Sequence, residues 1–534
     1  MAVYYVSPTG TDTNSGTSLD QPLSTIAAAH ELVNPGDTIY LRGGTYDLPL
    51  DTTTTLSKSG TADAPIRLMA YQDEVPILDG SAWTKYDDRN SNSILITQTG
   101  DYWHVEGLEI TGGPRNGYLA FSVEGSVFKD LNIHHNDNTG LQLYGDNSNN
   151  LILGGEFHHN FDAANNGQDA DGIGIKFGSG EGNVVDGVRM YNNSDDGIDM
   201  WDFDGSVTIR NSESFGHGVD RWDHGPLFEG NGNGFKLSGG DASSVTETQH
   251  VLHNNIAWGN TTRGFDYNNS AGSFDVYNNT AYDNGYAGFN FASGTHELRN
   301  NLSFDNGVNQ LIGDSVVDTA NSWSSDVDVT ADDFVSLDPT SPDFLRLAED
   351  SDLVDAGVPA GTSFNGSAPD LGAFEFGPDP DQTGTIEGRF FIDTNGNNKF
   401  DEGDRAVSDH RVQLRRDGEK VAVTRTDADG NYDFQDVLAQ DGYRIRFFQE
   451  DIDLEFSNQR NQYVGNAGNL NSAKLTVEAG ETALQDGFFL DWAEACVMPD
   501  ASRDALQGQV EHAEIDTSGG YDIFQDMEAA DFIL

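Results

Sequence analysis

Short apolar runs alternate with corners rich in glycine and asparagine along the middle of the chain. From about residue 105 the runs repeat, and each repeat holds a Gly-apolar-x triplet. A repeat of two to three dozen residues predicts a solenoid, and the shortness of the apolar runs favours strands over helices. The repeated glycines are Gly140, Gly172, Gly197, Gly234, Gly264 and Gly288.

The N-terminal residues have a different pattern. Residues 2–8 and 35–46 alternate like strands, and residues 23–33 have apolar positions at helical spacing. An amphipathic helix here predicts a cap, because the open end of a solenoid would otherwise expose apolar side chains and unpaired backbone groups. We therefore expect an all-β chain whose first domain, residues 1–376, is a parallel β-helix with an N-terminal helix cap.

Three further segments follow this domain. Residues 377–385 are a linker rich in proline, glycine and aspartate, and residues 386–490 alternate like the strands of a small β-sandwich. Residues 491–534 form an acidic tail that ends in apolar residues. Since the start MAVYYVSP lacks a signal-peptide pattern, we expect a secreted bacterial protein with this tail as its export signal, or else a disordered tail.

The charge of the chain limits its partners. Lys and Arg number 28 and Asp and Glu 88, so the formal net charge is −60. This charge argues against nucleic acid and anionic membranes as partners and favours a monomer. No apolar run approaches the length of a membrane span. Cys496 is the only cysteine, which excludes an intrachain disulfide and a zinc ribbon.

Asparagine recurs at the corners between strands, in HHND from residue 134, HHNF from 158, YNNS from 191, WGNT from 258 and YDNG from 282. Equivalent positions in neighbouring coils lie about 4.8 Å apart, the ordinary spacing of strands. Asparagine side chains at such positions stack into hydrogen-bonded ladders. We interpret these residues as structural.

The same spacing turns the alignment on the glycines into a map of neighbours. It brings four aspartates together and places a lysine one coil above them: Asp171, Asp195, Asp196 and Asp199, with Lys236. Carboxylates crowded in this way need a cation. Ca²⁺, which takes about six to eight hard oxygen ligands, fits better than metals that prefer His or Cys.

Three segments around these residues resemble the pectate lyases of polysaccharide lyase family nine. They are QDADGIGIKFGSGEGNV (168–184), MYNNSDDGIDMW (190–201) and GNGFKLSGG (232–240). The resemblance covers residues 2–375 and implies a right-handed parallel β-helix that cleaves polygalacturonate, or a related uronate polymer, by calcium-assisted β-elimination. It implies that the four aspartates bind the catalytic calcium and that Lys236 abstracts the C5 proton.

The chemistry agrees with this resemblance. The proton at C5, α to the carboxylate, is weakly acidic, and a calcium ion on the uronate carboxylate would stabilise the charge that develops. A lysine acts as a base only when neutral, which desolvation and a nearby divalent cation favour. Substrate carboxylates would contact basic residues in neighbouring coils, although surface ion pairs explain each of them equally well: Lys176, Arg210, Arg221 and Arg263.

Three other functions fit a β-helix of this composition. An inverting polygalacturonase would use two aspartates as acid and base, and Gly216-His217-Gly218 resembles one of its motifs, but its Arg-x-Lys element is missing. An alginate-type epimerase also abstracts a proton at C5, but its Tyr-Gly-x-Asp-Pro-His signature is absent. The third is a carbohydrate-binding β-helix without catalysis.

The second domain contains a candidate calcium loop. Oxygen ligands recur at the spacing of an EF-hand-like site, with the carbonyl of Lys399 at the seventh position: Asp393, Asn395, Asn397, Lys399, Asp401 and Asp404. The strands around the loop resemble the B-type repeats of bacterial surface adhesins. The resemblance implies a calcium-stabilised spacer, and a metal-free turn is the alternative.

Overall fold

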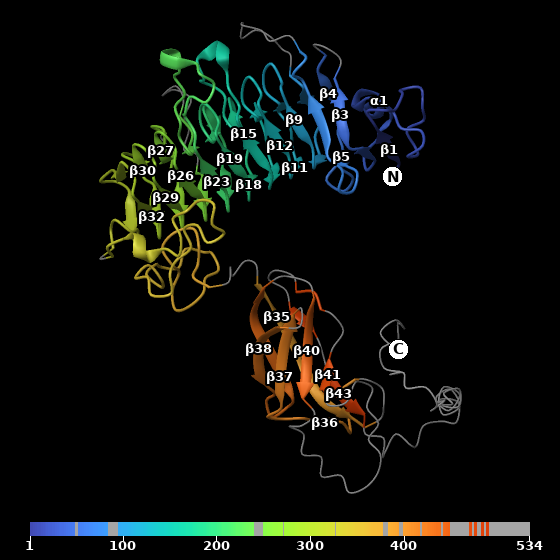
Figure 1. Cartoon of the computed structure of the whole chain (residues 1–534), viewed down its shortest axis with the longest axis vertical. Coiled ribbons are helices and arrows are strands. Elements are labelled where there is room, and N and C mark those ends of the chain that lie inside the picture. The colour runs from blue at the N-terminus through green and yellow to red at the C-terminus, as the bar shows by residue number, and fades with distance from the viewer. Residues whose placement is uncertain are drawn as a thin grey trace, which may run out of the picture. The chain divides into compact units, whose positions relative to one another are not determined.

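The computed structural model describes the chain in two compact units, Met1–Gly377 and Pro378–Leu534 (Figure 1). The described residues are 1–48, 52–83, 94–239, 249–270, 272–325, 327–377, 383–394, 399–416, 419–438, 442–448, 469–471, 475–477, 482–484 and 487–490. The predicted tail, 491–534, and residues 378–382 of the predicted linker lie outside them. Among the described residues, no helix has the length and apolar character needed to cross a membrane.

The first unit is a right-handed parallel β-helix, which confirms the predicted fold class. Three parallel sheets run along it, and a typical coil contributes one strand to each. We call them sheets I, II and III. Two short strands, β17 (Gly178–Ser179) and β21 (Phe203–Asp204), pair outside the three sheets.

Sheet I contains β1 (Val3–Val6), β2 (Thr38–Leu41), β5 (Ile66–Ala70), β8 (Trp103–Glu106), β11 (Val127–Lys129), β14 (Leu151–Leu153), β18 (Asn183–Asp186), β22 (Val207–Arg210), β25 (Val251–His253), β28 (Asp275–Tyr277), β31 (Glu297–Arg299) and β34 (Val317–Thr319). Sheet II contains β4 (Thr54–Leu56), β7 (Ile96–Gln98), β10 (Tyr118–Phe121), β13 (Leu141–Tyr144), β16 (Ile173–Lys176), β20 (Ile198–Asp199), β24 (Phe235–Lys236), β27 (Arg263–Asp266), β30 (Ala287–Phe291) and β33 (Val308–Ile312). Sheet III contains β3 (Gly44–Asp47), β6 (Pro76–Asp79), β9 (Glu109–Thr111), β12 (Asn132–His134), β15 (Glu156–His158), β19 (Arg189–Tyr191), β23 (Glu213–Phe215), β26 (Ile256–Trp258), β29 (Thr280–Tyr282) and β32 (Leu302–Phe304).

Alternate residues of these strands fill the interior of the coil. In sheet II the inward positions include three phenylalanines whose rings stack from coil to coil. The centroids of Phe235 and Phe265 are 4.8 Å apart with an interplanar angle of 2°, and those of Phe265 and Phe289 are also 4.8 Å apart. These distances match the strand spacing, so like side chains meet like side chains along the axis.

Buried asparagines form ladders at the corners, as the sequence predicted. Asn160 Nδ2 donates to Asn193 Oδ1 (2.9 Å), Asn260 Nδ2 to Asn284 Oδ1 (2.9 Å), and Asn284 Nδ2 to Asn306 Oδ1 (2.8 Å). Each amide thus satisfies polar groups that a corner would otherwise bury unpaired. A second ladder includes Asn255, Asn279, Asn301 and Asn321.

The N-terminal end of the coil is covered by a helix, and the segment after the last coil packs against the side of the solenoid. Helix α1 (Ile26–Leu32) begins after Thr25, whose hydroxyl accepts from the N–H of Ala28, and buries Ile26 and Ala29 in the core. This agrees with the predicted cap. The last solenoid strand ends at Thr319, and residues from Phe334 to Leu371 pack on the outside of sheet III instead of adding further coils. The sequence had predicted a β-helix domain that extends to residue 376.

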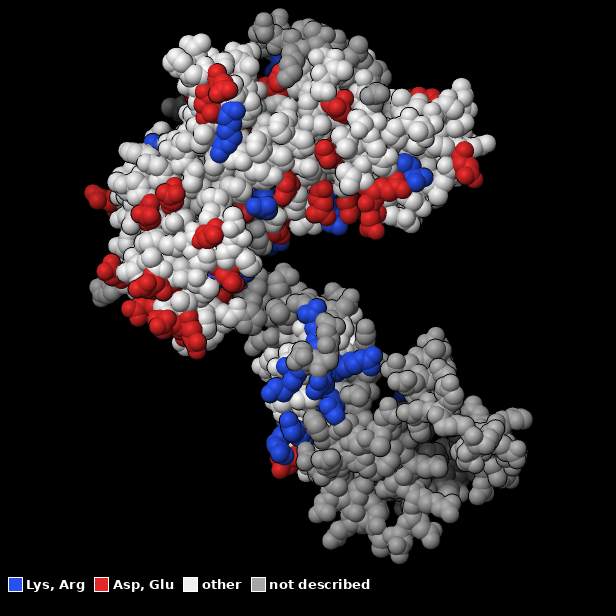
Figure 2. Space-filling view, in the orientation of Figure 1, with Lys and Arg blue, Asp and Glu red and all other residues white. Residues whose placement is uncertain are grey.

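Among the described residues of the first unit, three short 3₁₀ helices lie in loops, at Ala163–Asn165, Gly225–Leu227 and Ala331–Asp333. The second unit is a pair of mainly antiparallel sheets around its own core. Its strands are β35 (Thr383–Asp393), β36 (Arg405–Ala406), β37 (Arg411–Arg416), β38 (Glu419–Arg425), β39 (Asn431–Leu438), β40 (Tyr443–Phe448), β41 (Asn469–Asn471), β42 (Thr482–Leu484) and β43 (Gly487–Leu490). Basic side chains gather on this unit, whereas acidic ones are spread over the visible face of the first (Figure 2).

The ladder can be tested at Asn260. Asn260→Ala removes the amide that bonds to Asn284, to the carbonyl of Ser214 and to the N–H of His217. Because these groups stay buried, we expect the free energy of unfolding to fall by about 2–4 kcal/mol in urea titrations. The exposed Asn309 is the control, and equal effects of Asn260→Ala and Asn309→Ala would refute the structural role of the ladder.

Candidate active site

The strand register of sheet II brings the predicted residues to one face. Gly174 pairs with Asp199, Asp199 with Lys236, and Lys236 with Asp266. Asp171 and Asp196 lie at the preceding corners, where the N–H of Gly172 donates to the carbonyl of Asp196 (3.1 Å). These residues form two rows along the solenoid axis, one with Asp171 and Asp196 and one with Asp199 and Lys236. The alignment on the glycines had predicted that these residues are neighbours.

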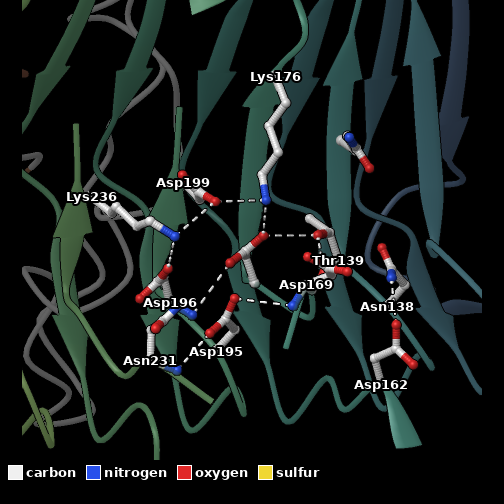
Figure 3. A network of polar contacts seen from close by, with 12 residues as sticks. Asn138, Thr139, Asp162, Asp169, Lys176, Asp195, Asp196, Asp199, Asn231 and Lys236 are labelled. Carbon is white, nitrogen blue, oxygen red and sulfur yellow. Dashed lines mark hydrogen bonds and ion pairs between the residues drawn. The ribbon is translucent and has the colours of Figure 1, made fainter. Parts of the chain in front are cut away.

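The four carboxylates converge in a buried cluster (Figure 3). Oxygen atoms of Asp171, Asp195 and Asp196 lie within 4.8 Å of one another. The carboxylate of Asp195 accepts from the backbone N–H groups of Asp169 (3.0 Å) and Asn231 (2.6 Å). These bonds fix the position of Asp195.

The other two corner aspartates are also held by neighbours. Asp196 Oδ1 accepts from the backbone N–H and the side-chain amide of Asn233, each at 2.8 Å. Asp171 Oδ2 accepts from the hydroxyl of Thr139 (3.0 Å). The cluster is therefore preorganised before any ligand arrives.

Two buried lysines neutralise part of this charge. Lys236 Nζ is 2.9 Å from Asp196 Oδ2 and 3.3 Å from Asp199 Oδ2. Lys176 Nζ is 2.7 Å from Asp171 Oδ2 and 2.8 Å from Asp199 Oδ2. Lys176 reaches these oxygens by passing over Gly174, where an added Cβ would lie only 3.3 Å from Lys176 Cε.

The lysines do not balance the carboxylates. Burial, together with the charges of Asp199 and Asp196, outweighs Lys176 and raises the pKa of Asp171 to about 6. Burial and the adjacent Asp196 likewise raise the pKa of Asp195 well above its usual value. At Asp199, by contrast, the two ammonium groups outweigh burial and lower the pKa. The corner beside Asp195 therefore lacks positive charge.

Lys236 is held in its protonated, ammonium form by the carboxylates around it. Burial favours the neutral amine of Lys236, but the carboxylates of Asp196, Asp199, Asp195 and Asp171 together outweigh burial and raise its pKa well above the usual value. Lys236 cannot act as a base until this negative charge is offset.

A divalent cation fits the cluster. Among the described residues, Asp199 Oδ1 is buried without a hydrogen-bond partner, and the surrounding donors are carboxylate oxygens. Four carboxylates and two ammonium groups leave two negative charges, which one divalent ion balances. Hard oxygen donors of this kind suit Ca²⁺.

The other basic residues differ in position. Arg263 lies in the same corner row as Asp171 and Asp196, with its guanidinium 3.3 Å from Asp266 and above the ring of Tyr286. Arg221 is exposed in the loop after β23, where it donates to the carbonyl of Gly216. Arg210 is on sheet I, paired with Asp186 at 2.8 Å, so the structure does not bring it to the cluster.

His217, the histidine of the Gly-His-Gly motif, is a step of the asparagine ladder. Its ring Nδ1 accepts from the backbone N–H of Asn193, and the backbone N–H of His217 donates to Asn260 Oδ1. Burial lowers its pKa to about 3. A fully buried neutral imidazole in the ladder does not face substrate, which counts against the hydrolase alternative.

Some supporting residues were missed by the sequence analysis. Asn233 stands in the row of Asp171 and Asp196, so the alignment held a signal for it. Asn231 lies at the end of a long insertion, residues 216–231, and nothing in the sequence indicated its backbone contact with Asp195. The insertion also places the ring of Trp222 against Phe161, with centroids 4.6 Å apart.

The candidate calcium loop of the second unit is described at its two ends. Asp404 Oδ1 accepts from the N–H of Thr394 (2.8 Å), and its Oδ2 accepts from the N–H of Asp401 (2.9 Å). Asp393 is buried at the end of β35. Asn395 and Asn397 lie outside the described residues. Asp404 thus closes the loop, and the carboxylates of Asp393 and Asp401 belong to its described ends.

Comparison with known proteins places this architecture. Residues 4–309 match the family described as Pel9A-like, right handed beta helix region, and residues 384–487 match the SdrD B-like domain. Pectate lyase L of Dickeya chrysanthemi is 39% identical over 397 residues, 70% of this chain and 90% of that protein. Pectate lyase PEL9 of Emericella nidulans is 38% identical over 358 residues, 62% of this chain and 86% of that protein.

Solved structures agree. The crystal structure of pectate lyase Pel9A has a TM-score of 0.63 and 36% identity, and covers 71% of this chain and 97% of its own. A rhamnogalacturonan lyase has a TM-score of 0.58 and 26% identity, and covers 66% and 97%. The fold, the site and these relatives define a polysaccharide lyase. The chain belongs to the Pel9A-like right-handed β-helix family, which confirms the resemblance seen in the sequence, and it carries an SdrD B-like domain.

The electrostatics of the cluster predict how cation binding depends on pH. Protons compete with a cation at Asp171 and Asp195, whose pKa values are raised, so calcium affinity increases as pH rises through about 6. Without calcium, the protonated carboxyls are the stable folded form, and stability falls over the same range. At pH 8 and calcium about 100 times its Kd, we expect the unfolding temperature of the first unit to rise by about 3–6 °C.

Differential scanning calorimetry from pH 5 to pH 8 measures this effect. Asp171→Asn should abolish the calcium response. The control, Asp186→Asn, breaks an ion pair on sheet I and should keep the response. A calcium response that is independent of pH, or one retained by Asp171→Asn, would contradict the assignment.

Proposed function

We propose that the chain is a calcium-dependent lyase that cleaves polygalacturonate, or a closely related uronate polymer, by β-elimination. The observation that carries this proposal is the position of Lys236, whose ammonium group lies against a buried cluster of four carboxylates on the outer face of sheet II. The names of the relatives, pectate lyases above all, support the substrate class.

Asp171, Asp195, Asp196 and Asp199 would hold the calcium ion. When bound, the ion supplies positive charge that binds the uronate carboxylate, stabilises the charge developing on it, and offsets the carboxylates that hold Lys236 protonated. The surplus negative charge of the cluster supports this assignment.

Lys236 then acts as the base. Its neutral amine takes the proton from C5, the electron pair forms the C4–C5 double bond, and the glycosidic oxygen leaves from C4 and takes a proton from solvent. The low exposure of Lys236 keeps the amine partly desolvated, which favours the neutral form once the carboxylates are offset.

Lys176 and Arg263 were both predicted to contact substrate, but the structure supports this role only for Arg263. Lys176 is buried between Asp171 and Asp199, so we assign it to positioning those carboxylates. Arg263 is partly exposed one coil beyond Lys236 and is the better candidate to bind a substrate carboxylate. Arg221 is a candidate only for a substrate that reaches the insertion.

Rhamnogalacturonan is the second candidate substrate. The rhamnogalacturonan lyase with a TM-score of 0.58 is the observation that favours it. Either polymer implies action outside the cell, since neither crosses a membrane. Secretion therefore belongs to the proposal.

Near-ultraviolet absorbance during incubation with polygalacturonate, and in parallel with rhamnogalacturonan, tests the reaction. An unsaturated product raises the absorbance in calcium and not in EDTA. Lys236→Ala should lower the rate at least about 100-fold, because general base catalysis is lost, and Lys236→Arg should do the same since arginine stays protonated.

The control is Lys129→Ala, which removes a surface ion pair with Glu106 on sheet I and should leave the rate unchanged. Calorimetry verifies that each variant is folded. New reducing ends without absorbance would indicate hydrolysis, and a full rate in EDTA would refute the calcium role.

We also propose that calcium stabilises the second unit through Asp393, Asp401, Asp404 and the carbonyl of Lys399, with Asn395 and Asn397 as further ligands. The closed ends of the loop support this proposal. Asp401→Asn should lose the calcium-dependent rise in the unfolding temperature of this unit, and the exposed Asp433→Asn should keep it. An unchanged response in Asp401→Asn would refute the site.

A further inference from the structure

Four aromatic side chains are exposed beside the cluster. Phe121, Tyr144, Phe177 and Trp201 keep 45%, 37%, 44% and 37% of their surface accessible. We call them the aromatic row. A contiguous exposed set of this kind marks a binding surface more often than isolated exposed side chains do.

The register shows how the row forms. Phe121 pairs with Tyr144 and Tyr144 with Lys176, each two residues beyond the row of Gln142, Gly174 and Asp199, so these positions share the outer face of sheet II. The rings of Phe121 and Tyr144 stack with centroids 5.7 Å apart and an interplanar angle of 13°.

Phe177 fills the place that Lys176 leaves. The side chain of Lys176 turns to Asp171 and Asp199, and the next residue, Phe177, adopts φ 57° and brings its ring within 5.3 Å of Tyr144. Among the described residues, asparagine and aspartate fill most of the left-handed positions that glycine does not occupy, and a bulky phenylalanine there costs free energy. The row is thus maintained at some cost to the fold.

The row leads to the site. Lys236 Nζ lies 5.9 Å from the centroid of the Trp201 ring. From there the row runs over β16, β13 and β10, toward the N-terminal coils. It therefore follows the solenoid axis and has one end at the proposed base.

The aromatic stack on sheet III gives a contrast. There the rings of Tyr191, Phe215 and Trp258 stack face to face, but Arg189 lies over the first two and Phe344 contacts the third. That stack is covered by the protein itself. In the aromatic row Lys236 lies over the ring of Trp201, but all four side chains still keep 37–45% of their surface accessible.

We propose that the aromatic row binds the sugar rings of the uronate polymer that precede or follow the reacting residue, one face of each ring lying on an aromatic side chain. This inference rests on the proposed function and assigns it further subsites. Pyranose rings present apolar C–H faces, and aromatic rings pack against such faces. A ring spacing of 5.3–5.7 Å is of the size of one sugar unit.

The double variant Tyr144→Ala/Phe177→Ala tests the row. With polygalacturonate we expect KM to rise about five- to tenfold and kcat to stay within about twofold, because contacts distant from the bond that breaks contribute to binding. With trigalacturonate, which is too short to cover the row and the site, both constants should change less than about twofold. Tyr144→Trp/Phe177→Tyr should restore the polymer KM.

Phe364→Ala, an exposed phenylalanine outside sheet II, is the control and should not change KM. Equilibrium binding of polygalacturonate and of rhamnogalacturonan to Lys236→Ala, with and without the double substitution, keeps this test separate from the proposed reaction. If the unsubstituted enzyme forms no unsaturated product, the proposed function fails, and weaker binding by the double variant still supports the row. Unchanged KM and unchanged binding, or an equal loss on trigalacturonate, would overturn the inference.

Discussion

The parallel pairing of successive coils determines which side chains of this protein meet. A typical coil adds one strand to each sheet, and a residue in a strand has its equivalent about 4.8 Å further along the axis. Asparagine stacks on asparagine and phenylalanine on phenylalanine because the register brings equivalent positions into contact, and His217 takes one step of the asparagine ladder. The same step places Asp171 next to Asp196, although like charges at this distance repel, and it places Asp199 next to Lys236, which attracts it.

The site uses the energy of this repulsion. The coils are held together by buried ladders and apolar stacks, so the carboxylates cannot move apart, and the protein compensates them with two buried lysines. Two negative charges remain, expressed as the raised pKa values of Asp171 and Asp195. A divalent cation would complete this balance and at the same time remove the field that keeps Lys236 protonated. In this account one event, binding of the cation, assembles the electrophile and prepares the base.

The fold and the rows of this site could be predicted from the sequence because glycine and asparagine recur at the same position of successive coils and so reveal the repeat. Aligning Gly172, Gly197 and Gly234 was enough to bring the aspartates and Lys236 together. The contacts of Lys176 could not be predicted. Its side chain bends toward the aspartates only because Gly174 has no side chain in the way and because Asp171 and Asp199 attract the ammonium group. Arg210 lies in a coil next to the cluster, as predicted, but on sheet I. The repeat period indicates which coil a residue belongs to, whereas insertions of variable length prevent the sequence from indicating which sheet it lies on. Asn231 belongs to an insertion that has no repeat to align.

X-ray diffraction from crystals grown with calcium would show whether the cluster binds the ion. We expect one anomalous peak in the β-helix unit, bounded by carboxylate oxygens of Asp171, Asp195, Asp196 and Asp199, with the ammonium of Lys236 moved away from Asp196. A cluster without a peak, with Lys236 still paired to Asp196 and Asp199 at saturating calcium, would refute the proposed calcium site.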